Sequence, residues 1–535
     1  MLSLAQALEH YHVIRQTFAP LRLSRWQLTK LVFAQIWRDL PPVARIVALI
    51  SALVLPVWIL SWSLQPKPLR KLGIPPAPKP KGKKLDFEQV LVDSAAKYPD
   101  SPFLLNAFGT DYVVYPSKCF DEIKKLPEST ASALAFFREV FHERWTSAGQ
   151  QTHELRQTIA VDLSRAIPSL VHSRQKDCAA ACDRAIGSCE DWKEIILYSA
   201  MQDLIASTNA SAFVGRELGT DPRWIKAVNR LPMAVAIASV LVSYIPLLLR
   251  SLAKPLLFLP TLWIRSSMKR MLRPIIEADM REYEQTADKK SLLGPKEKGK
   301  VQLTGWLMSR YKGQVTLEQL VKDYITVSFE STPSSAGTLF FVVAELAADP
   351  ALAEELREEI KTVLDEDGHL PQSHLNGLQK MDSVMRESSR MNGFSHLVLY
   401  RKLLTPRKLS IGPELPAGTN ICVDAHNINY SEKLWDNPAK SDGLRHYRTR
   451  QDPKNESRFK FANLGNDAPG WGDGLQACPG RLFADNTIKI ALTHLLLHYD
   501  FKLRLGDEKP KKGSMPNGSM MPDLKAKVLF KSRNL

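Results

Sequence analysis

A single cysteine in a glycine-rich loop is the most chemically suggestive feature of the sequence. Cys478 lies within Trp471–Ala484, WGDGLQACPGRLFA, between two glycines and a stretch with a helical pattern. This pattern places the sulfur near a helix N-terminus, where free N–H groups and the helix dipole favour a thiolate. A thiolate on such a loop is a suitable ligand for haem iron. The alternative is a buried, unreactive cysteine, which is common in intracellular proteins.

The loop resembles the cysteine loop of the cytochrome P450 superfamily, whose pattern is F-G-x-G-x-[HR]-x-C-x-G. Trp471 stands for the usual Phe, and Gln476 stands where a basic residue normally contacts a haem propionate. The tail CPGRLFA is similar to that of fungal microsomal members in secondary metabolism, including those similar to ent-kaurene oxidase that act on diterpenes. The resemblance implies that Cys478 is the axial ligand of a haem iron. The matching positions are Gly472, Gly474, Cys478 and Gly480.

A second motif precedes the loop. Glu387 and Arg390 lie three residues apart, which makes them neighbours on one face of a predicted helix. They match the E-x-x-R of the family, and SDGLRHYR resembles the segment that supplies a further arginine, Arg445. A buried carboxylate between two guanidinium groups balances charges that are costly to bury alone. The resemblance implies a structural triad behind the cysteine loop that takes no part in the chemistry.

The opposite side of the haem departs from the family pattern. A long apolar helix is predicted up to a break at Asp349 and Pro350, and family members carry [AG]-G-x-[DE]-T-[TS] in it to deliver protons to oxygen. Counting back from Pro350 places Ser334 at the alcohol position and Pro333 at the acid position. A proline cannot relay a proton, and inside a helix it kinks the axis. Two catalytic candidates stay open: Ser334 from the spacing, and Glu330 one turn earlier.

Other predicted site residues lie in two segments. His153 and Arg156 fall where family members contact a haem propionate, although a solvated helix face is an equal alternative. In GFSHLVLYRKL, Arg401 would approach a propionate, because this segment resembles the strand that borders the haem pocket. The residues expected to line the substrate site are His396, Leu397 and Val398.

The composition excludes several classes of protein. Lys and Arg number 72 against 56 Asp and Glu, which gives a formal net charge of +16. No basic run is interleaved with aromatic residues, so we expect an anionic membrane or an acidic protein as partner, and no nucleic acid. Six cysteines are too few for a disulfide framework.

The apolar pattern divides the chain into four parts. Residues 46–64 carry no charge and are long enough to span a hydrocarbon core of about 30 Å. The stretch that follows is rich in proline and lysine and predicts a stiff, solvated tether. The predicted parts are an N-terminal segment (1–43), a transmembrane anchor (44–65), the tether (66–85) and a haem-thiolate domain (86–535) with a membrane-facing apolar segment (231–264).

The resemblance also implies a location. Family members of this type are single-pass proteins of the endoplasmic reticulum with a cytosolic catalytic domain, and the basic tether weakly favours the same topology. The glycosylation sequons would then stay unmodified, since glycosylation takes place in the lumen. A second span at 231–249 is the less favoured alternative, because it would displace the flanking catalytic elements.

The expected fold is mainly helical with a small β lobe (α+β), the cytochrome P450 fold preceded by a transmembrane helix. The implied reaction inserts one atom of O2 into a hydrophobic molecule, expected to be a terpenoid or polyketide-type intermediate of fungal secondary metabolism. Electrons would come from NADPH through NADPH–cytochrome P450 reductase. Two alternatives remain: a haem-thiolate isomerase or dehydratase that does not activate O2, suggested by Pro333, and a non-catalytic membrane haem-binding protein.

Overall fold

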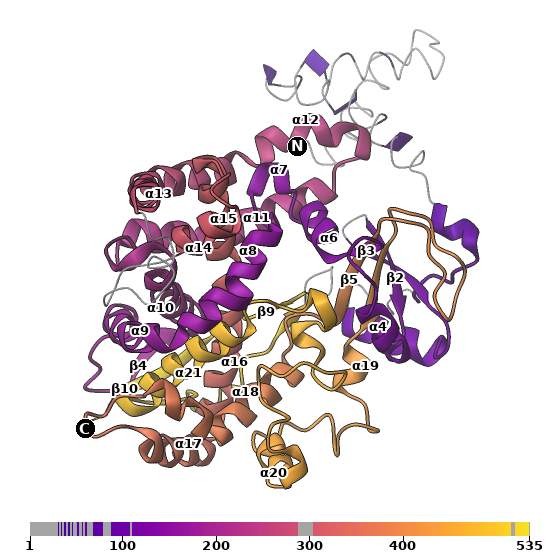
Figure 1. The fold of residues 1–535 in the computed structure, drawn as a ribbon. Coiled ribbons are helices and arrows are strands. Elements are labelled where there is room, and N and C mark those ends of the chain that lie inside the picture. Colours follow the sequence, from indigo (N-terminus) through magenta and orange to yellow (C-terminus); the bar gives the residue numbers. More distant parts are fainter. Residues whose placement is uncertain are drawn as a thin grey trace, which may run out of the picture. The chain divides into compact units, whose positions relative to one another are not determined.

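The computed structural model divides into two units, and the second contains every element discussed below (Figure 1). One unit comprises residues 1–66 and 245–252, and the other comprises 67–244 and 253–535. The predicted anchor at 44–65 lies outside the described residues, apart from isolated positions. The structure describes residues 68–78, 87–107, 110–286, 303–514 and 519–533, together with isolated positions between 30 and 60.

Part of the predicted tether is packed onto the domain, so the prediction of a solvated tether is wrong for residues 68–78. This stretch begins with a short 3₁₀ helix, Pro68–Leu72. Leu69 and Ile74 are buried in the core, and the amide of Ala77 donates to the carbonyl of Leu104 at 2.8 Å. Apolar side chains among the prolines and lysines explain the packing, because their burial outweighs solvation of the backbone.

A five-stranded sheet forms the small β-rich part, in the order β1-β2-β6-β5-β3. It lies beside helix α4 (Phe87–Lys97), as Figure 1 shows. β5 and β6 pair antiparallel, and β5 confirms the strand predicted around Arg401. The sheet therefore joins segments near residues 100 and 400. Its strands are β1 (Phe103–Ala107), β2 (Thr110–Tyr115), β3 (Ala131–Ser132), β5 (Leu397–Leu403) and β6 (Asn420–Asp424).

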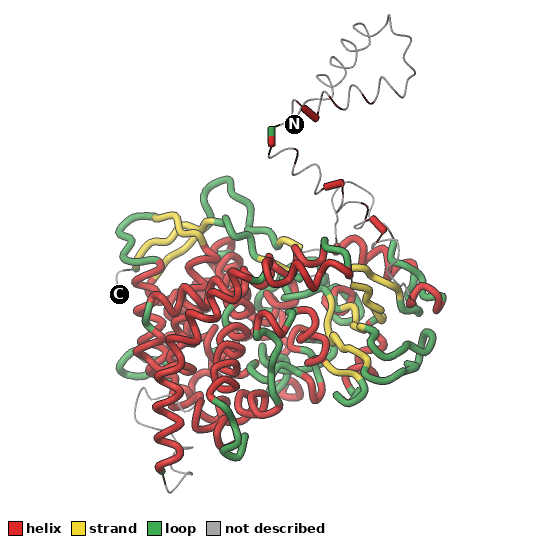
Figure 2. The backbone as a smooth tube through the Cα atoms, turned by 90° about the horizontal axis from the view of Figure 1, so that it is seen from above, coloured by secondary structure: helices red, strands yellow, loops and turns green. Residues whose placement is uncertain are grey.

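A second sheet is separate from the first, as Figure 2 shows. It has the order β4-β10-β7, with β4 at Lys193–Ile196, β7 at Tyr499–Lys502 and β10 at Lys527–Ser532. The sequences HYDFKLRLGD (498–507) and KAKVLF (525–530) predict strands, which β7 and β10 confirm. The sequence of residues 190–226 predicts helices, and this is wrong for β4, because pairing with the C-terminal strand overrides its local helical preference.

Four helices form the main core with their buried faces. α9 (Ser164–Ala185) and α10 (Leu197–Gly219) contact each other and α21 (Arg481–His498), the helix that follows the cysteine loop. α16 (Pro333–Ala348) is buried on most of its circumference and packs against α10 and α21. A helix that is apolar on all sides belongs in the centre of a domain. This arrangement brings the cysteine loop and the predicted oxygen-side helix into one core.

The predicted long apolar helix is broken at Thr332. α15 runs from Leu317 to Ser331, and α16 begins at Pro333, so proline occupies the first turn of a new helix. Proline is tolerated there because the N–H that it lacks would have no partner in the helix. The expectation of a kink inside one helix is thus replaced by a break with two helix ends.

Two long helices carry apolar residues on both their buried and exposed sides. α11 (Pro222–Ser243) begins after its N-cap Asp221, and α13 spans Leu259–Gln285. In the described residues α11 is the one single helix long and apolar enough to cross a membrane, and 39% of its apolar window is buried in the protein. The bent pair Leu317–Ala348 and Pro350–Val363 also meets that criterion. These helices pack in the domain core, so length and composition alone do not make them spans.

Candidate functional site

The cysteine loop is a compact turn held by its own backbone. The amide of Cys478 donates to the carbonyl of Trp471 at 2.8 Å, which closes the loop. Gly474 has a φ of 68°, and a Cβ there would lie 2.5 Å from the carbonyl oxygen of Lys124. Only glycine therefore fits this close approach. α21 begins at Arg481, so the sulfur lies just before its N-terminus, as the sequence predicted.

Gln476, which replaces the usual basic residue, is fully engaged with the protein. Its Oε1 accepts from the amide of Ala133 at 2.7 Å, and its Nε2 donates to the carbonyls of Ala131 and Leu126 at 2.9 and 3.2 Å. A side-chain amide can satisfy a backbone N–H and carbonyls together, whereas an arginine or lysine can only donate. Gln476 therefore ties the cysteine loop to the segment 126–133 instead of presenting a charge.

The protein does not by itself favour a thiolate at Cys478, contrary to the prediction. Burial raises the pKa of this thiol, and the nearby Glu330 carboxylate acts in the same direction. The Gly480 amide and the charges of Arg481 and Arg156 oppose these effects without outweighing them. Desolvation exceeds the helix-terminus effect here. A thiolate at this position thus needs a cation, and a bound metal deprotonates its thiol ligand outright.

Two arginines lie together near the loop. Arg156, from α8 (His153–Gln157), donates to the carbonyls of Leu475 and Ala477 at 2.6 and 3.1 Å. Arg401 is 3% exposed, and among the described residues its Nε and Nη2 have no hydrogen-bond partner. Burial and the neighbouring charge of Arg156 lower the pKa of Arg401 to about 10. A buried guanidinium with free donors fits an anionic ligand, so this pair suits the two carboxylates of a haem.

His153 does not share this position. Its side chain is exposed in the first turn of α8, so the predicted propionate contact has no support from its location. The equal alternative, a solvated helix face, describes His153 better. The buried residue of α8 is Leu155, which does not lie on the same helix face as His153.

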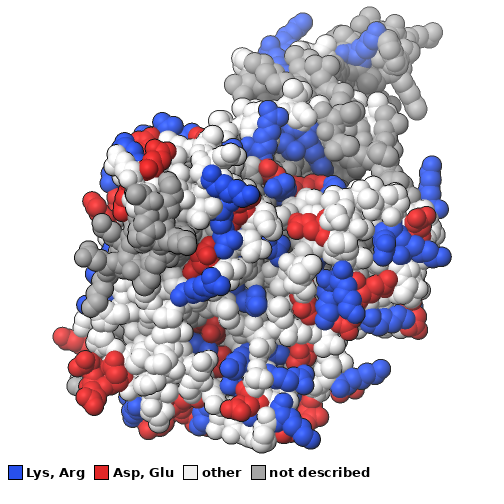
Figure 3. All heavy atoms as spheres, in the orientation of Figure 1, with Lys and Arg blue, Asp and Glu red and all other residues white. Residues whose placement is uncertain are grey.

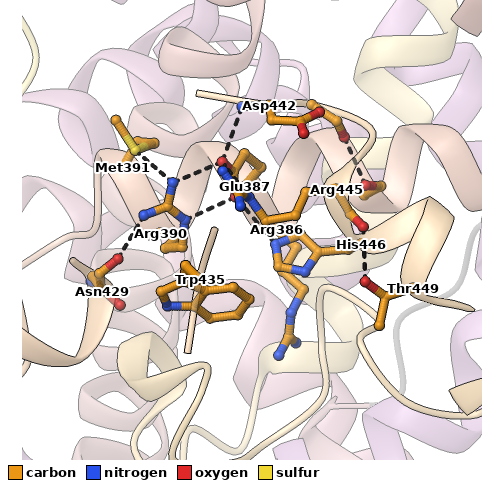
Figure 4. A network of polar contacts seen from close by, with 12 residues as sticks. Arg386, Glu387, Arg390, Met391, Asn429, Trp435, Asp442, Arg445, His446 and Thr449 are labelled. Atoms are coloured by element: carbon orange, nitrogen blue, oxygen red, sulfur yellow. Dashed lines mark hydrogen bonds and ion pairs between the residues drawn. The ribbon is translucent and has the colours of Figure 1, made fainter. Parts of the chain in front are cut away.

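The E-x-x-R residues form a buried charge network that Figure 4 shows from close by. Both oxygens of Glu387 accept from Arg390, on α18 (Gln379–Met391), at 2.8 and 2.9 Å. The Nε of Arg445 and the amide of Asp442 reach Glu387 Oε1 at 3.2 and 3.0 Å. Nε2 of His446 lies 3.3 Å from Glu387 Oε2. The predicted triad therefore comes together, and His446 is a member that the motif did not contain.

The charges in this network outweigh the cost of burial. Burial alone opposes ionisation of Glu387, but the hydrogen bonds from Arg390 and the contact with His446 lower the pKa of the carboxyl to about 2. Burial lowers the pKa of His446 despite its contact with Glu387. Glu387 is thus ionised at all physiological pH values and neutralised by arginine.

A second buried ion cluster was not predicted. Asp382, one turn and a half before Glu387 on α18, contacts Lys489 of α21 at 2.7 Å and Arg450 at 3.3 Å. Arg450 ends α20 (Arg445–Arg450), and Lys489 also pairs with Asp485 at 3.0 Å. The spacing of Asp485 and Lys489 is the sequence signal that could have suggested it. The cluster joins the E-x-x-R helix to the helix that follows Cys478.

The two proton-relay candidates, Glu330 and Ser334, lie on either side of the break between α15 and α16. The carboxyl of Glu330 contacts the side-chain amide of Gln151, and burial raises its pKa to about 7. Its charge influences the Cys478 thiol, which places the two groups in one region. The hydroxyl of Ser334, one turn later, lies 3.4 Å from the carbonyl of Glu330. Sequence spacing favours Ser334, whereas the raised pKa and the contact with Gln151 distinguish Glu330.

A second acid lies two turns earlier on α15. Asp323 is fully buried and accepts from Tyr311 and Gln319 at 3.0 and 2.9 Å. Burial raises its pKa to about 7. The hydroxyl of Tyr311 also lies 2.7 Å from that of Thr152, the N-cap of α8. α15 is thus linked by buried polar groups to the segment that precedes Arg156.

Two of the three predicted substrate-lining residues pack beside α4. His396 is 4% exposed, its ring stacks on Phe87 with centroids 6.1 Å apart, and its Nε2 is 4.0 Å from Glu88. Leu397 is buried in the same packing layer. His396 and Leu397 thus pack near α4, and their role in lining the substrate site stays a prediction. Val398 is 8% exposed, and its role stays a prediction.

Comparisons with known proteins agree on one family. The family model described as cytochrome P450 matches residues 195–530. The chain is 59% identical, over its whole length and 98% of the relative, to a cytochrome P450 monooxygenase (CYP1) of Pyricularia oryzae. It is 40% identical, over 98% of both chains, to pyrichalasin C-18 hydroxylase of Pyricularia grisea. The solved structure of retinoic-acid-bound cyanobacterial CYP120A1 is similar in fold, with a TM-score of 0.60 and 16% identity over 83% of this chain and 94% of that one.

Proposed function

This chain belongs to the cytochrome P450 family, and we propose that it hydroxylates a hydrophobic terpenoid or polyketide-type intermediate of fungal secondary metabolism while anchored to a membrane. Family membership makes it an oxidoreductase that incorporates oxygen from O2, with a haem-thiolate cofactor and a reductase as electron donor. The isomerase, dehydratase and non-catalytic alternatives are therefore set aside. We take NADPH as the source of electrons.

The residues around the cysteine loop are the ones proposed to hold the cofactor. Cys478 would be the axial ligand, because its sulfur ends the closed loop before α21. Arg401 and Arg156 would neutralise the propionates, since their charges lie close together and Arg401 has buried donors free. Bound haem supplies the redox chemistry of O2 activation, and the protein supplies orientation and exclusion of water.

Proton handling on the opposite side is assigned to Glu330. A carboxyl with a pKa of about 7 can give up and regain a proton at physiological pH. Gln151 contacts it, and Ser334 lies just across the break, at the start of α16. In this proposal the acid of the usual motif is replaced by one at the end of α15, before the break at Thr332.

The substrate proposal draws on the relatives and on the apolar core. One relative is named as a hydroxylase of pyrichalasin, so hydroxylation at a defined carbon of a secondary metabolite is the reaction we expect. Large hydrophobic molecules suit an enzyme with apolar residues exposed on α11 and α13. Ile237, Leu241, Leu259 and Trp263 are each at least 45% exposed.

The same exposed residues support a membrane location. We place the chain in the endoplasmic reticulum as a single-pass protein with a cytosolic catalytic domain, held by the apolar segment 46–64. Figure 3 shows Lys and Arg side chains spread among acidic ones over the face seen in that view. A net charge of +16 suits both an anionic lipid surface and an acidic reductase.

The experiment that tests this proposal measures the haem ligand and the product together. The reduced, carbon-monoxide-bound full-length protein is expected to show the red-shifted band of a thiolate ligand, and Cys478→Ser is expected to lose it. Cys119→Ser, which changes another buried cysteine, should keep the band. Deletion of the gene should remove one hydroxylated metabolite and accumulate its precursor. Retention of the band in Cys478→Ser, or an unchanged metabolite profile, would overturn the proposal.

A further inference from the structure

A buried arginine forms the centre of a polar network between three core helices. Arg174 of α9 is completely buried, and its guanidinium lies 4.1 Å from the ring centre of Phe483. It donates to Asn486 and Thr487 of α21 and to Asn209 of α10. All these acceptors are neutral, so the network distributes one charge over several polar groups.

Asn209 extends this network to the break between α15 and α16. Its Oδ1 accepts from the Thr487 hydroxyl at 2.9 Å, and its Nδ2 donates to the carbonyl of Ser331 at 3.2 Å. Asn209 is 2% exposed, so these contacts are made without competition from water. One side chain therefore connects the helix after the cysteine loop with the last residue of α15.

The carbonyl that Asn209 binds belongs to a helix end that needs an external donor. The last carbonyls of a helix have no partner within it, and Pro333 supplies no N–H to the preceding turn. The hydroxyl of Ser334 serves the carbonyl of Glu330, and Asn209 serves that of Ser331. Unsatisfied carbonyls inside a core are costly, so the donor fixes where the break can lie.

We propose that Asn209 is a positioning residue that holds the α15–α16 break in place and thereby sets Glu330 and Ser334 relative to the cysteine loop. The part concerning Glu330 and Ser334 rests on the proposed function. The hydrogen bond from Asn209 to the Ser331 carbonyl, called the tie below, rests on the contacts of Asn209 alone. Thr487 and Arg174 hold the acceptor end of Asn209, so its donor end cannot turn away from Ser331 without breaking the network.

The variant that tests the tie is Asn209→Asp. An aspartate keeps the acceptor for Thr487 and gives Arg174 a carboxylate partner, but it cannot donate to the Ser331 carbonyl. The unfolding temperature is therefore expected to stay the same or rise. Hydrogen exchange of the amides in residues 328–336 of the haem-loaded, full-length protein is expected to be roughly five- to tenfold faster, as loss of one buried hydrogen bond implies.

The matched control is Asn486→Asp. It makes the same chemical change beside the same arginine, and its lost donor contacts Gln372, 3.2 Å away, instead of the break. Exchange in residues 328–336 should remain at the wild-type rate. Equal exchange rates in Asn209→Asp and wild type, or equal acceleration in both aspartate variants, would overturn the proposed tie.

A second comparison, in the Pro333→Ala background, separates an action of Asn209 on the break from an effect on general stability. Pro333→Ala allows a more continuous helix, in which the amide of Ser335 can serve the Ser331 carbonyl, so the external donor becomes partly redundant. The effect of Asn209→Asp on exchange should fall to less than half in the Pro333→Ala background. An undiminished effect there would show that Asn209 acts on general stability and not on the break.

A spectroscopic readout separates the tie from the proposed function. The infrared stretching frequency of carbon monoxide on the reduced protein responds to polar groups beside the ligand and needs no substrate. We expect this frequency to shift in Asn209→Asp and not in Asn486→Asp. Faster exchange without a shift would keep the tie but refute the placement of Glu330 and Ser334 beside the oxygen ligand.

Discussion

At the scale of single residues, the most consequential groups are two carboxyls on α15 whose protons are held by burial. Asp323 and Glu330 both have a pKa raised to about 7. In the unfolded chain such groups ionise near pH 4. Between about pH 4 and pH 7 the folded protein binds protons that the unfolded chain has lost, so each group stabilises the fold less as pH rises.

Asp323→Asn should remove one of these contributions. Because the folded pKa is raised, its favourable effect is complete below about pH 4 and is lost as pH rises through 7. Wild type should therefore lose about 2–4 kcal/mol more stability than the variant between pH 4 and 8. Denaturant unfolding across this range measures the difference.

The matched control is Asp367→Asn, which changes an exposed loop residue. Its pH dependence of unfolding should follow wild type. Parallel curves for wild type and Asp323→Asn would contradict the assignment of the proton to the folded state of Asp323.

Glu330→Gln should separate electron use from product formation. The amide keeps the contact with Gln151 but carries no exchangeable acid proton, so NADPH oxidation should release mainly hydrogen peroxide and product should fall by about tenfold or more. Ser334→Ala should have a smaller effect, because that hydroxyl serves a backbone carbonyl. Product and peroxide are measured with the metabolite that accumulates in the gene deletion. Normal coupling in Glu330→Gln would rule out its proton role.

At the scale of elements, the helix behind the cysteine loop is held by two charge clusters on α18. One is centred on Glu387 and the other on Asp382, which contacts Lys489 on α21. Breaking a buried ion pair leaves an uncompensated charge, so Lys489→Met should destabilise the fold by about 3–5 kcal/mol. Thermal or denaturant unfolding of the full-length protein measures it.

A surface pair provides the comparison. Lys361 and Glu358 are both more than half exposed, so Lys361→Met should cost less than about 1 kcal/mol. If Lys489→Met is equally mild, the cluster contributes no more than a surface ion pair. If the haem thiolate band also changes in Lys489→Met alone, the cluster affects the position of α21 as well as stability.

Elements were predictable from the sequence wherever local pattern and motif spacing agreed. The strand around Arg401 and the helix that carries Glu387 and Arg390 are two such cases. β4 was missed because its strand state depends on pairing with residues more than three hundred positions away. The chemistry of the site was predictable at Cys478 and Glu387, because each belongs to a motif with a fixed residue spacing. A tertiary contact such as that of Asn209 with Ser331 was not predictable, because neither the residue types nor their order in the sequence indicates it.

At the scale of the whole molecule, several apolar side chains on α11 and α13 are exposed on the surface. Ile237 and Leu241 are neighbours of Ala238 and Val242, which pack with Phe258 just before α13. An exposed apolar patch of this kind suits a lipid surface. The proposed membrane contact therefore involves more of the chain than the anchor.

The double variant Leu259→Ser and Trp263→Ser should weaken this contact. Both residues are more than half exposed, so the loss of apolar area should lower membrane retention with little effect on unfolding. Flotation with anionic vesicles, using the chain from residue 67 onward, measures retention apart from the anchor. The control is a serine substitution at the exposed Leu505, which lies outside these helices. If the double variant and the Leu505 variant are retained equally well, the surface of α13 does not contact the membrane.

The unmatched guanidinium of Arg401 has a consequence for the life of the protein in the cell. A buried cation without a hydrogen-bonded anion raises the free energy of the folded chain, and a bound dianion removes that cost. The chain without haem then unfolds more often than the haem-bound chain, so quality-control proteases degrade it more readily. The amount of enzyme that accumulates should therefore follow the supply of haem.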